Sequence, residues 1–140
     1  MLTAKDIGQV ERLDGLRGDW YLIGLMGGPP PDKLAKLNRR EYQQWEFPLR
    51  KELAERPPVT VDETGAIEMT LTSDGEVDEW RLRPGLMRDN DDAARYGRSS
   101  QYRASRHLIC LLAGDKMLED VDALPAGAYF ALIEAIGAGF

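Results

Sequence analysis

The hydrophobic pattern of this chain changes its period at Pro57-Pro58, and that change limits which folds the sequence can adopt. Before the two prolines, apolar side chains recur at steps of three or four, as one buried face of a helix requires. From residue 59 onward, apolar and polar side chains alternate, which is typical of a strand with one buried face. Because proline has no amide donor and restricts the residue before it, neither element continues through the pair. The sequence therefore predicts an N-terminal helical subdomain, residues 1–58, followed by a second unit, residues 59–140.

The clearest helix of the first unit spans residues 38–56. Asn38 suits its N-cap, and Glu41 stands where a capping box places its acidic residue. Pro48 lies in the middle of the pattern, where it should kink or restart the helix. A single apolar stripe runs along the helix and consists of Tyr42, Trp45, Leu49 and Leu53.

Weaker helical patterns precede this helix. Residues 3–17 carry apolar side chains at three-residue steps and predict a weak helix. Residues 20–26 form a compact apolar block, which Asp19 would cap if the block is helical. A run of glycine and proline, residues 27–31, then breaks the chain, and residues 32–37 predict one or two helical turns.

The second unit begins with a β-hairpin pattern. Apolar and polar residues alternate over residues 67–72 and again over residues 79–83. Asp74-Gly75 between these runs is a strong signal for a hairpin turn. The side chains that share the apolar face are Ile67, Met69, Leu71, Trp80 and Leu82.

Helical patterns return after the hairpin. A polar helix is predicted for residues 86–96, and a short buried helix for residues 108–112, which Gly114 ends. A last helix opens at Leu124-Pro125, since proline is tolerated at the first helical position. Its apolar stripe consists of Tyr129, Phe130, Ile133 and Ile136. The predicted fold class is therefore α+β and mostly helical, with an N-terminal helical subdomain, one β-hairpin, and C-terminal helices packed on it.

Charge and composition narrow the setting of the protein. The net charge of −6 disfavours a nucleic-acid binder, because phosphate contacts need a basic face. The only stretch compatible with nucleic-acid binding is residues 95–106, which contain four arginines with two tyrosines between them. The preferred interpretation of this stretch is a surface whose arginines balance the charge of nearby Asp residues. Apolar runs are too short for a membrane span. A single cysteine, Cys110, fits a reducing compartment, and the N-terminus lacks a secretory pattern, so we expect a cytoplasmic protein.

Residues suited to catalysis are few. His107 is the only histidine and lies beside an apolar run, which favours a structural or surface role. Cys110 stands between apolar neighbours and is expected to be a small core residue. Loops beginning at Asp74 or Asp89 miss the calcium-loop pattern. The acidic clusters at residues 89–92 and 119–122 are interpreted as solvated helix starts or loops. A pair of acids for glycoside hydrolysis stays open, although no spacing supports it. We therefore expect a protein that is not an enzyme and that has no metal or cofactor.

The C-terminal part resembles a known family over residues 67–140. The order of its elements is similar to that of the small tail assembly chaperones of long-tailed bacteriophages. The segments that carry the resemblance are Trp80-Arg-Leu-Arg-Pro84, Leu108-Ile-Cys-Leu-Leu-Ala-Gly114, Leu118-Glu-Asp-Val-Asp-Ala-Leu124-Pro125 and Tyr129-Phe-Ala-Leu-Ile133. A shorter segment, from Asp19 to Leu49, resembles small phage minor tail proteins through Trp20, the Gly-Pro-Pro-Pro-Asp break and Glu41-Tyr-Gln-Gln-Trp45.

The resemblance implies a non-enzymatic chaperone in the host cell cytoplasm. Such a protein binds the tape measure protein, a long helical chain, and keeps it soluble during tail assembly. Apolar helical surfaces suit that role, and self-association into a homo-oligomer would add avidity. The alternative is a structural minor tail or baseplate-associated protein that stays in the virion. The residues expected to contact a partner are Tyr129, Phe130, Ile133, Ile136 and Phe140, with Tyr42 and Trp45 as a second patch.

Overall fold

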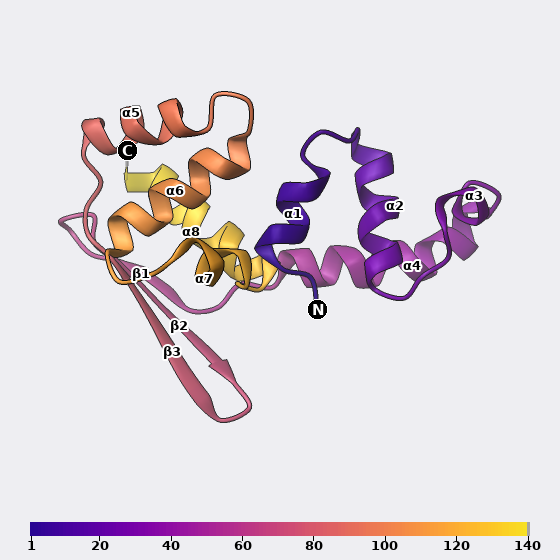
Figure 1. Cartoon of the computed structure of the whole chain (residues 1–140). Coiled ribbons are helices and arrows are strands. Elements are labelled where there is room, and N and C mark those ends of the chain that lie inside the picture. Colours follow the sequence, from indigo (N-terminus) through magenta and orange to yellow (C-terminus); the bar gives the residue numbers. More distant parts are fainter. Residues whose placement is uncertain (140) are drawn as a thin grey trace.

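The chain forms helices at both ends with an antiparallel sheet between them, and the computed structural model describes the backbone of residues 1–139 and the side chains of residues 1–137 (Figure 1). The elements are α1 (Ala4–Val10), α2 (Gly15–Leu25), α3 (Pro31–Leu34), α4 (Arg39–Ala54), β1 (Val59–Val61), β2 (Ile67–Ser73), β3 (Glu76–Leu82), α5 (Met87–Tyr96), α6 (Gln101–Ala113), α7 (Leu118–Asp122) and α8 (Ala126–Gly139). This arrangement confirms the predicted α+β, mostly helical class.

Helix α4 begins as its sequence predicts. The Asn38 side chain accepts a hydrogen bond from the Glu41 amide at 2.9 Å, and the Glu41 carboxylate accepts one from the Asn38 amide at 3.3 Å. This capping box satisfies two amides that the first helical turn leaves without partners. The predicted restart of the helix at Pro48 is wrong, because α4 continues through this residue to Ala54. Pro48 itself is exposed, and the burial of its neighbour Leu49 in the smaller core favours the uninterrupted helix.

The first 26 residues divide differently from the prediction. Instead of one helix over residues 3–17, α1 ends at Val10 and α2 begins at Gly15. Asp14 is the N-cap of α2, and its carboxylate accepts a hydrogen bond from the Arg17 amide at 2.9 Å. Asp19 therefore lies inside α2 and pairs with Arg50 of α4 instead of capping a helix.

The hairpin forms as predicted, and a third strand adds to it. Within residues 1–139 the sheet has the order β1-β2-β3, all antiparallel, with Met69 opposite Trp80. Asp74 and Gly75 make the turn with φ of 51° and 81°, both in the left-handed region that a two-residue hairpin turn requires. The added strand β1 lies where the alternating pattern from residue 59 begins, and its Val59 stands opposite Met69. In Figure 1 the β2–β3 turn projects away from the helices.

The C-terminal helices cover the apolar face of the sheet. Ser100 is the N-cap of α6, and Gly114 ends this helix with a φ of 78°. The acidic connector of residues 118–122 forms the short helix α7. In the described part of the chain, no helix is long and apolar enough to cross a bilayer.

The buried side chains gather in two clusters. The larger core lies between the sheet, α6 and α8, and the smaller one lies among α2, α3 and α4. Every buried residue of the larger core except Ala4 of α1 comes from residue 59 onward, and every buried residue of the smaller core except Ala126 of α8 comes from residues 1–58. Helix α8 meets the end of α4 so closely that a Cβ at Gly127 would lie 1.9 Å from the Glu55 carbonyl oxygen. The two clusters are thus joined at the start of α8.

Candidate protein-binding surface

Two of the residues expected to contact a partner lie inside the molecule. Tyr129 is 5% exposed and Ile136 is 6% exposed, and both belong to the larger core. The Tyr129 ring packs against Tyr102 of α6, with the ring centroids 5.5 Å apart. A partner could reach these side chains only if the core opened, so the structure removes Tyr129 and Ile136 from the predicted contact surface.

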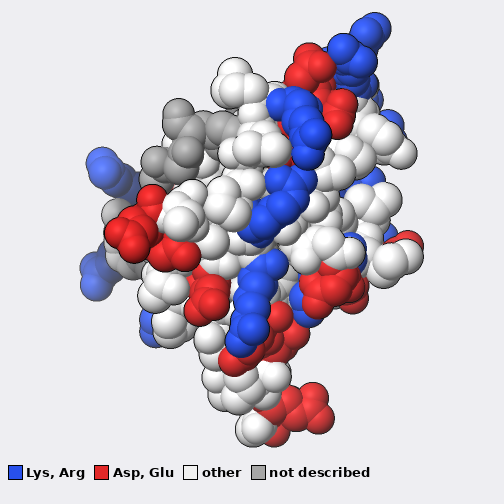
Figure 2. All heavy atoms as spheres, turned by 90° about the vertical axis from the view of Figure 1, so that its left-hand side faces the viewer, with Lys and Arg blue, Asp and Glu red and all other residues white. Residues whose placement is uncertain are grey.

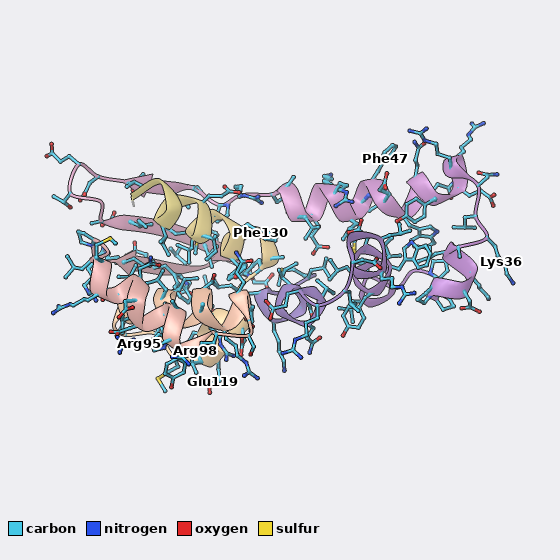
Figure 3. The ribbon with its side chains drawn as sticks, turned by 90° about the horizontal axis from the view of Figure 1, so that it is seen from above. Lys36, Phe47, Arg95, Arg98, Glu119 and Phe130 are labelled. Atoms are coloured by element: carbon cyan, nitrogen blue, oxygen red, sulfur yellow. The ribbon has the colours of Figure 1, made fainter. Side chains whose placement is uncertain are left out.

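The same helix keeps a small part of that surface. Phe130 and Ile133 are half-buried and pack at the margin of the larger core. The Arg56 guanidinium lies 5.5 Å from the centroid of the Phe130 ring and pairs with Glu134 at 2.8 Å. Figure 3 shows Phe130 on α8, at the side where α4 approaches. Arg56 therefore covers one face of the Phe130 ring that a partner would otherwise contact. Phe140 lies outside the described residues.

The second predicted patch is also largely internal. Tyr42 and Trp45 are half-buried and pack on the smaller core. Burial raises the pKa of the Tyr42 hydroxyl, and this buried hydroxyl finds no hydrogen-bond partner in the part of the chain that the structure describes. By contrast, Phe47 on the same helix is 60% exposed and points outward in Figure 3.

An apolar groove on α2 offers the more accessible surface. It encloses about 610 Å³ between α2 and the start of α3. Leu13 is 42% exposed and Leu25 is 48% exposed, although both are large apolar side chains. Gly24 leaves the middle open, since a Cβ there would meet nothing within 4 Å. The residues that line the groove are Leu13, Arg17, Trp20, Tyr21, Gly24, Leu25, Pro31 and Asp32.

The α2 groove is not apparent from the sequence pattern, because that pattern predicts the wrong helix boundary. With one helix over residues 3–17, Leu13 belongs to an inward stripe. With Asp14 as the N-cap, Leu13 instead precedes α2 and lies at the rim of the groove. The available signal was Asp14 itself, because aspartate before a glycine and a leucine is a good N-cap.

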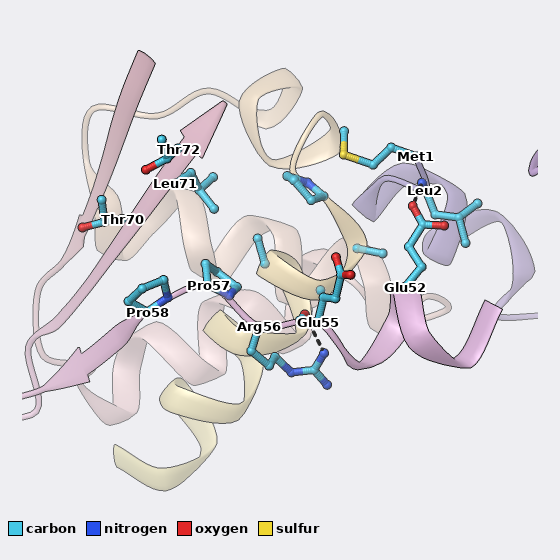
Figure 4. A pocket seen from close by; sticks show the side chains of 14 residues that line it. Met1, Leu2, Glu52, Glu55, Arg56, Pro57, Pro58, Thr70, Leu71 and Thr72 are labelled. Carbon is cyan, nitrogen blue, oxygen red and sulfur yellow. Dashed lines mark hydrogen bonds between the residues drawn. The ribbon is translucent and has the colours of Figure 1, made fainter. Parts of the chain in front are cut away.

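A second groove lies where the two core clusters meet. Figure 4 shows it between the end of α4, the strand β2 and the start of α8, and it encloses about 530 Å³. The Leu2 amide donates a hydrogen bond to the Glu52 carboxylate at 2.7 Å along one wall. On the opposite side, the Thr70 amide donates to the carbonyl of Pro58, the residue before β1, at 3.3 Å. The lining of this groove includes the charged residues Glu52, Glu55 and Arg56, whereas the α2 groove is mainly apolar.

Comparisons with protein-family models, curated proteins and solved structures gave no match.

The candidate catalytic residues occupy structural positions. His107 stacks on Tyr96 with centroids 4.1 Å apart and planes 7° from parallel. Cys110 is half-buried beside the larger core, and burial raises the pKa of its thiol, which disfavours the thiolate. Within residues 1–137, no three His, Cys, Asp or Glu side chains come together as a metal site would require.

In the acidic cluster at residues 89–92, which was expected to be solvated, one residue is buried. Asp89 lies near the start of α5 as expected, but its side chain is 3% exposed instead of solvated. Both of its carboxylate oxygens accept hydrogen bonds from the Arg83 guanidinium at 2.8 Å, and one also accepts from the Leu86 amide at 2.8 Å. The Arg83 hydrogen bonds lower the pKa of Asp89 to about 2. Asp89 therefore fastens the end of β3 to α5.

Two of the four arginines in residues 95–106 balance nearby Asp residues, as expected. Arg95 pairs with Asp91 at 3.0 Å, and Arg106 pairs with Asp122 at 3.0 Å. At the α5 end of the molecule, Figure 2 shows Lys and Arg side chains in a band flanked by Asp and Glu side chains. Arg98 and Arg103, however, form no ion pair with any described residue.

Proposed function

We propose that this chain is a non-enzymatic tail assembly chaperone of a bacteriophage, which binds the tape measure protein during tail assembly. The observation that carries the proposal is the apolar groove on α2, a surface open to solvent in which four of the eight lining residues are large apolar or aromatic side chains. A helix presents such side chains along one face, and helix-in-groove docking buries them. The groove supports binding of an amphipathic helix, which is the kind of segment a tape measure protein contains.

The chemistry of the groove suits repeated, moderate binding. Trp20 and Tyr21 supply aromatic anchors, the residue type that dominates the binding energy of many interfaces. Arg17 and Asp32 at the rim can pair with charged residues that flank an apolar helical face. A long helical chain offers many such faces, so several copies of this protein could hold one partner with gain of avidity.

The resemblance of residues 67–140 to tail assembly chaperones supports the same role. The hairpin, the apolar α6, the acidic α7 and the Pro-started α8 follow one another in the order expected of that family. The net charge of −6 would keep the complex soluble in the host cell cytoplasm, where tail assembly takes place.

Co-expression with the tape measure protein of the same genome tests the proposal. The wild-type chain should keep the tape measure protein in the soluble fraction and co-purify with it. The variant Leu13→Asp with Leu25→Lys places two charges in the groove without changing the net charge, and it should lose both effects. The matched control is Val77→Lys with Met87→Asp, which changes two exposed apolar residues on β3 and α5 in the same way. Retention of the tape measure protein by the groove variant would overturn the role of the groove.

Mass spectrometry of purified particles separates the chaperone from a structural tail protein. A chaperone leaves before the tail is complete, so the chain should be absent from mature virions. Its presence there in fixed copy number would replace the proposal by the structural alternative, a minor tail or baseplate-associated protein.

A further inference from the structure

We propose that a third groove, between α1 and α6, is a docking site for an acidic segment of a partner polypeptide. This cationic groove encloses about 380 Å³. Its charged lining residues are Lys5, Arg12, Arg103 and Arg106, with Glu11 and Asp122 between them. The inference does not depend on the identity of the partner, because it rests on the charges and hydrogen bonds of the groove.

Three of the four cations have no acidic partner. Lys5 lies on α1 and Arg12 just beyond its end, while Arg103 lies across the groove on α6. Among the side chains that the structure describes, none of these three forms an ion pair. A chain with a net charge of −6 thus gathers unpaired positive charge at one place, on both walls of a groove.

The two carboxylates in the groove are already engaged. Glu11 accepts hydrogen bonds from the Ser100 hydroxyl and, at 2.8 Å, from the Tyr102 amide. Asp122 accepts from the Tyr102 hydroxyl and from Arg106, whose Nη1 lies 3.0 Å from one carboxylate oxygen. These hydrogen bonds restrain both carboxylates, and neither of them pairs with Lys5, Arg12 or Arg103 among the described side chains.

The same bonds fix the width of the groove. Tyr102 packs on Gly8 of α1 so closely that a Cβ at Gly8 would lie 2.3 Å from the ring. Burial raises the pKa of the Tyr102 hydroxyl further above its ordinary value, so this group stays a donor to Asp122 at any physiological pH. The cations on the two walls therefore stand at a set spacing before a ligand arrives, which lowers the entropy cost of binding.

A carboxylate-bearing polypeptide fits the groove better than a phosphate or a nucleic acid. The amides at the start of α6 would chelate a phosphate, but Glu11 and Ser100 already accept from those of Tyr102 and Arg103. Bases need exposed aromatic rings to stack on, and Tyr102 is buried. Arginine and lysine side chains at separate points along two walls can each meet a different Asp or Glu of one segment.

The cationic groove also adjoins the apolar groove on α2. Tyr21 of the apolar groove donates a hydrogen bond to Gln9 of the cationic groove at 2.8 Å, and Leu13 directly follows Arg12. One partner segment can thus place apolar residues in the first groove and acidic residues in the second. The two grooves remain separable by mutation, because they share no lining residue.

A fluorescein-labelled glutamate-rich peptide of about 12 residues is the probe, with fluorescence polarisation as the measurement. Wild-type protein should bind it in a salt-sensitive manner. The variant Arg12→Glu with Arg103→Glu should weaken binding roughly tenfold, since it removes two attractive contacts and adds two repulsive ones. The control Arg39→Glu with Arg88→Glu changes two exposed arginines in the first turns of α4 and α5, where Glu is well tolerated, and should weaken binding less than about twofold.

Each of the following results would overturn the proposal. Absence of salt-sensitive binding up to millimolar protein means that the groove takes no acidic segment. Equal losses in the two double variants mean that binding follows net charge alone. Competition by inorganic phosphate at the same concentration as the peptide indicates a small-anion site, and tighter binding of an oligothymidylate indicates a nucleic-acid surface. Circular dichroism of both variants, together with Lys5→Gln with Arg12→Gln as a milder change, separates loss of the groove from loss of the fold.

Discussion

Replacing Asp89 by asparagine tests the contact that fastens the hairpin to the C-terminal helices. In the folded protein the Asp89 carboxylate is buried, accepts two hydrogen bonds from Arg83 and accepts a third from the Leu86 amide. Asparagine keeps the size of the side chain and one acceptor oxygen, but it loses the charge and the bidentate pairing. We therefore expect Asp89→Asn to weaken the link between β3 and α5 without emptying any space.

The size of the effect follows from the pKa of Asp89. Arg83 lowers this pKa from 3.8 to about 2 in the folded state. Since one pKa unit corresponds to about 1.4 kcal/mol, the ionised form should add roughly 2 kcal/mol to the free energy of unfolding at neutral pH. Arg83 is 42% exposed, and solvent screening reduces the contribution toward about 1 kcal/mol. We expect Asp89→Asn to lower the free energy of unfolding by about 1–2 kcal/mol at pH 7.

The pH dependence distinguishes charge from packing. Because the folded-state pKa is the lower one, this stability is fully present above the unfolded pKa of about 3.9 and is lost as the pH falls toward 2. Urea unfolding at several pH values from 7 to 2.5 should show the two proteins converging in stability at acidic pH. The matched control is Asp91→Asn, whose exposed pair with Arg95 should contribute less than about 0.5 kcal/mol. A difference between wild type and Asp89→Asn that stays constant with pH would refute the electrostatic account.

Two further predictions concern the junction of the cores and the half-buried thiol of Cys110. Gly127→Ala should lower the free energy of unfolding by about 1–3 kcal/mol, because its Cβ would collide with the backbone of Glu55. The control Gly137→Ala, in the same helix, has open space for its Cβ and should be neutral or slightly stabilising. Thermal unfolding of both variants is the measurement. Cys110 should react with a thiol reagent at pH 8 at least about tenfold more slowly in the folded protein than in urea. The reason is that partial burial raises the pKa of the thiol and limits access of the reagent. Equal rates in the two conditions would contradict the position of Cys110 beside the larger core.

The elements that the sequence predicted well are those with a strong local signal. The capping box at Asn38 and Glu41, and the Asp74-Gly75 turn, are each specified by side chains within a few residues. The alternation over residues 67–72 also placed the buried face of β2 correctly, with Ile67 and Met69 inside. For these elements, local chemistry and the tertiary fold favour the same structure.

The failures arise where packing decides between local alternatives. Pro48 removes one hydrogen bond from α4, but burial of the apolar stripe favours an uninterrupted helix. Tyr129 and Phe130 are adjacent in one apolar stripe, yet α6 covers the first and leaves the second half-exposed. Periodicity identifies such a stripe but does not show which neighbour covers it, so the predicted contact residues could not be separated from the core. The cationic groove was equally hidden, because Arg12 and Arg103 come from distant parts of the sequence.

Helix α1 connects the two candidate surfaces to the two cores. Its Ile7 packs against both the larger and the smaller core, and its neighbours Lys5 and Gln9 line the cationic groove. Thr3 pairs with Pro125 at the start of α8, which fixes α1 to the junction between the subdomains. A partner that occupies both grooves would therefore contact α6 and α2 at once, across a helix that belongs to both cores. The cationic groove is formed by α1 of one subdomain and α6 of the other, whereas the α2 groove lies within the N-terminal subdomain. A partner that occupies both grooves would therefore stabilise the relative position of the two subdomains.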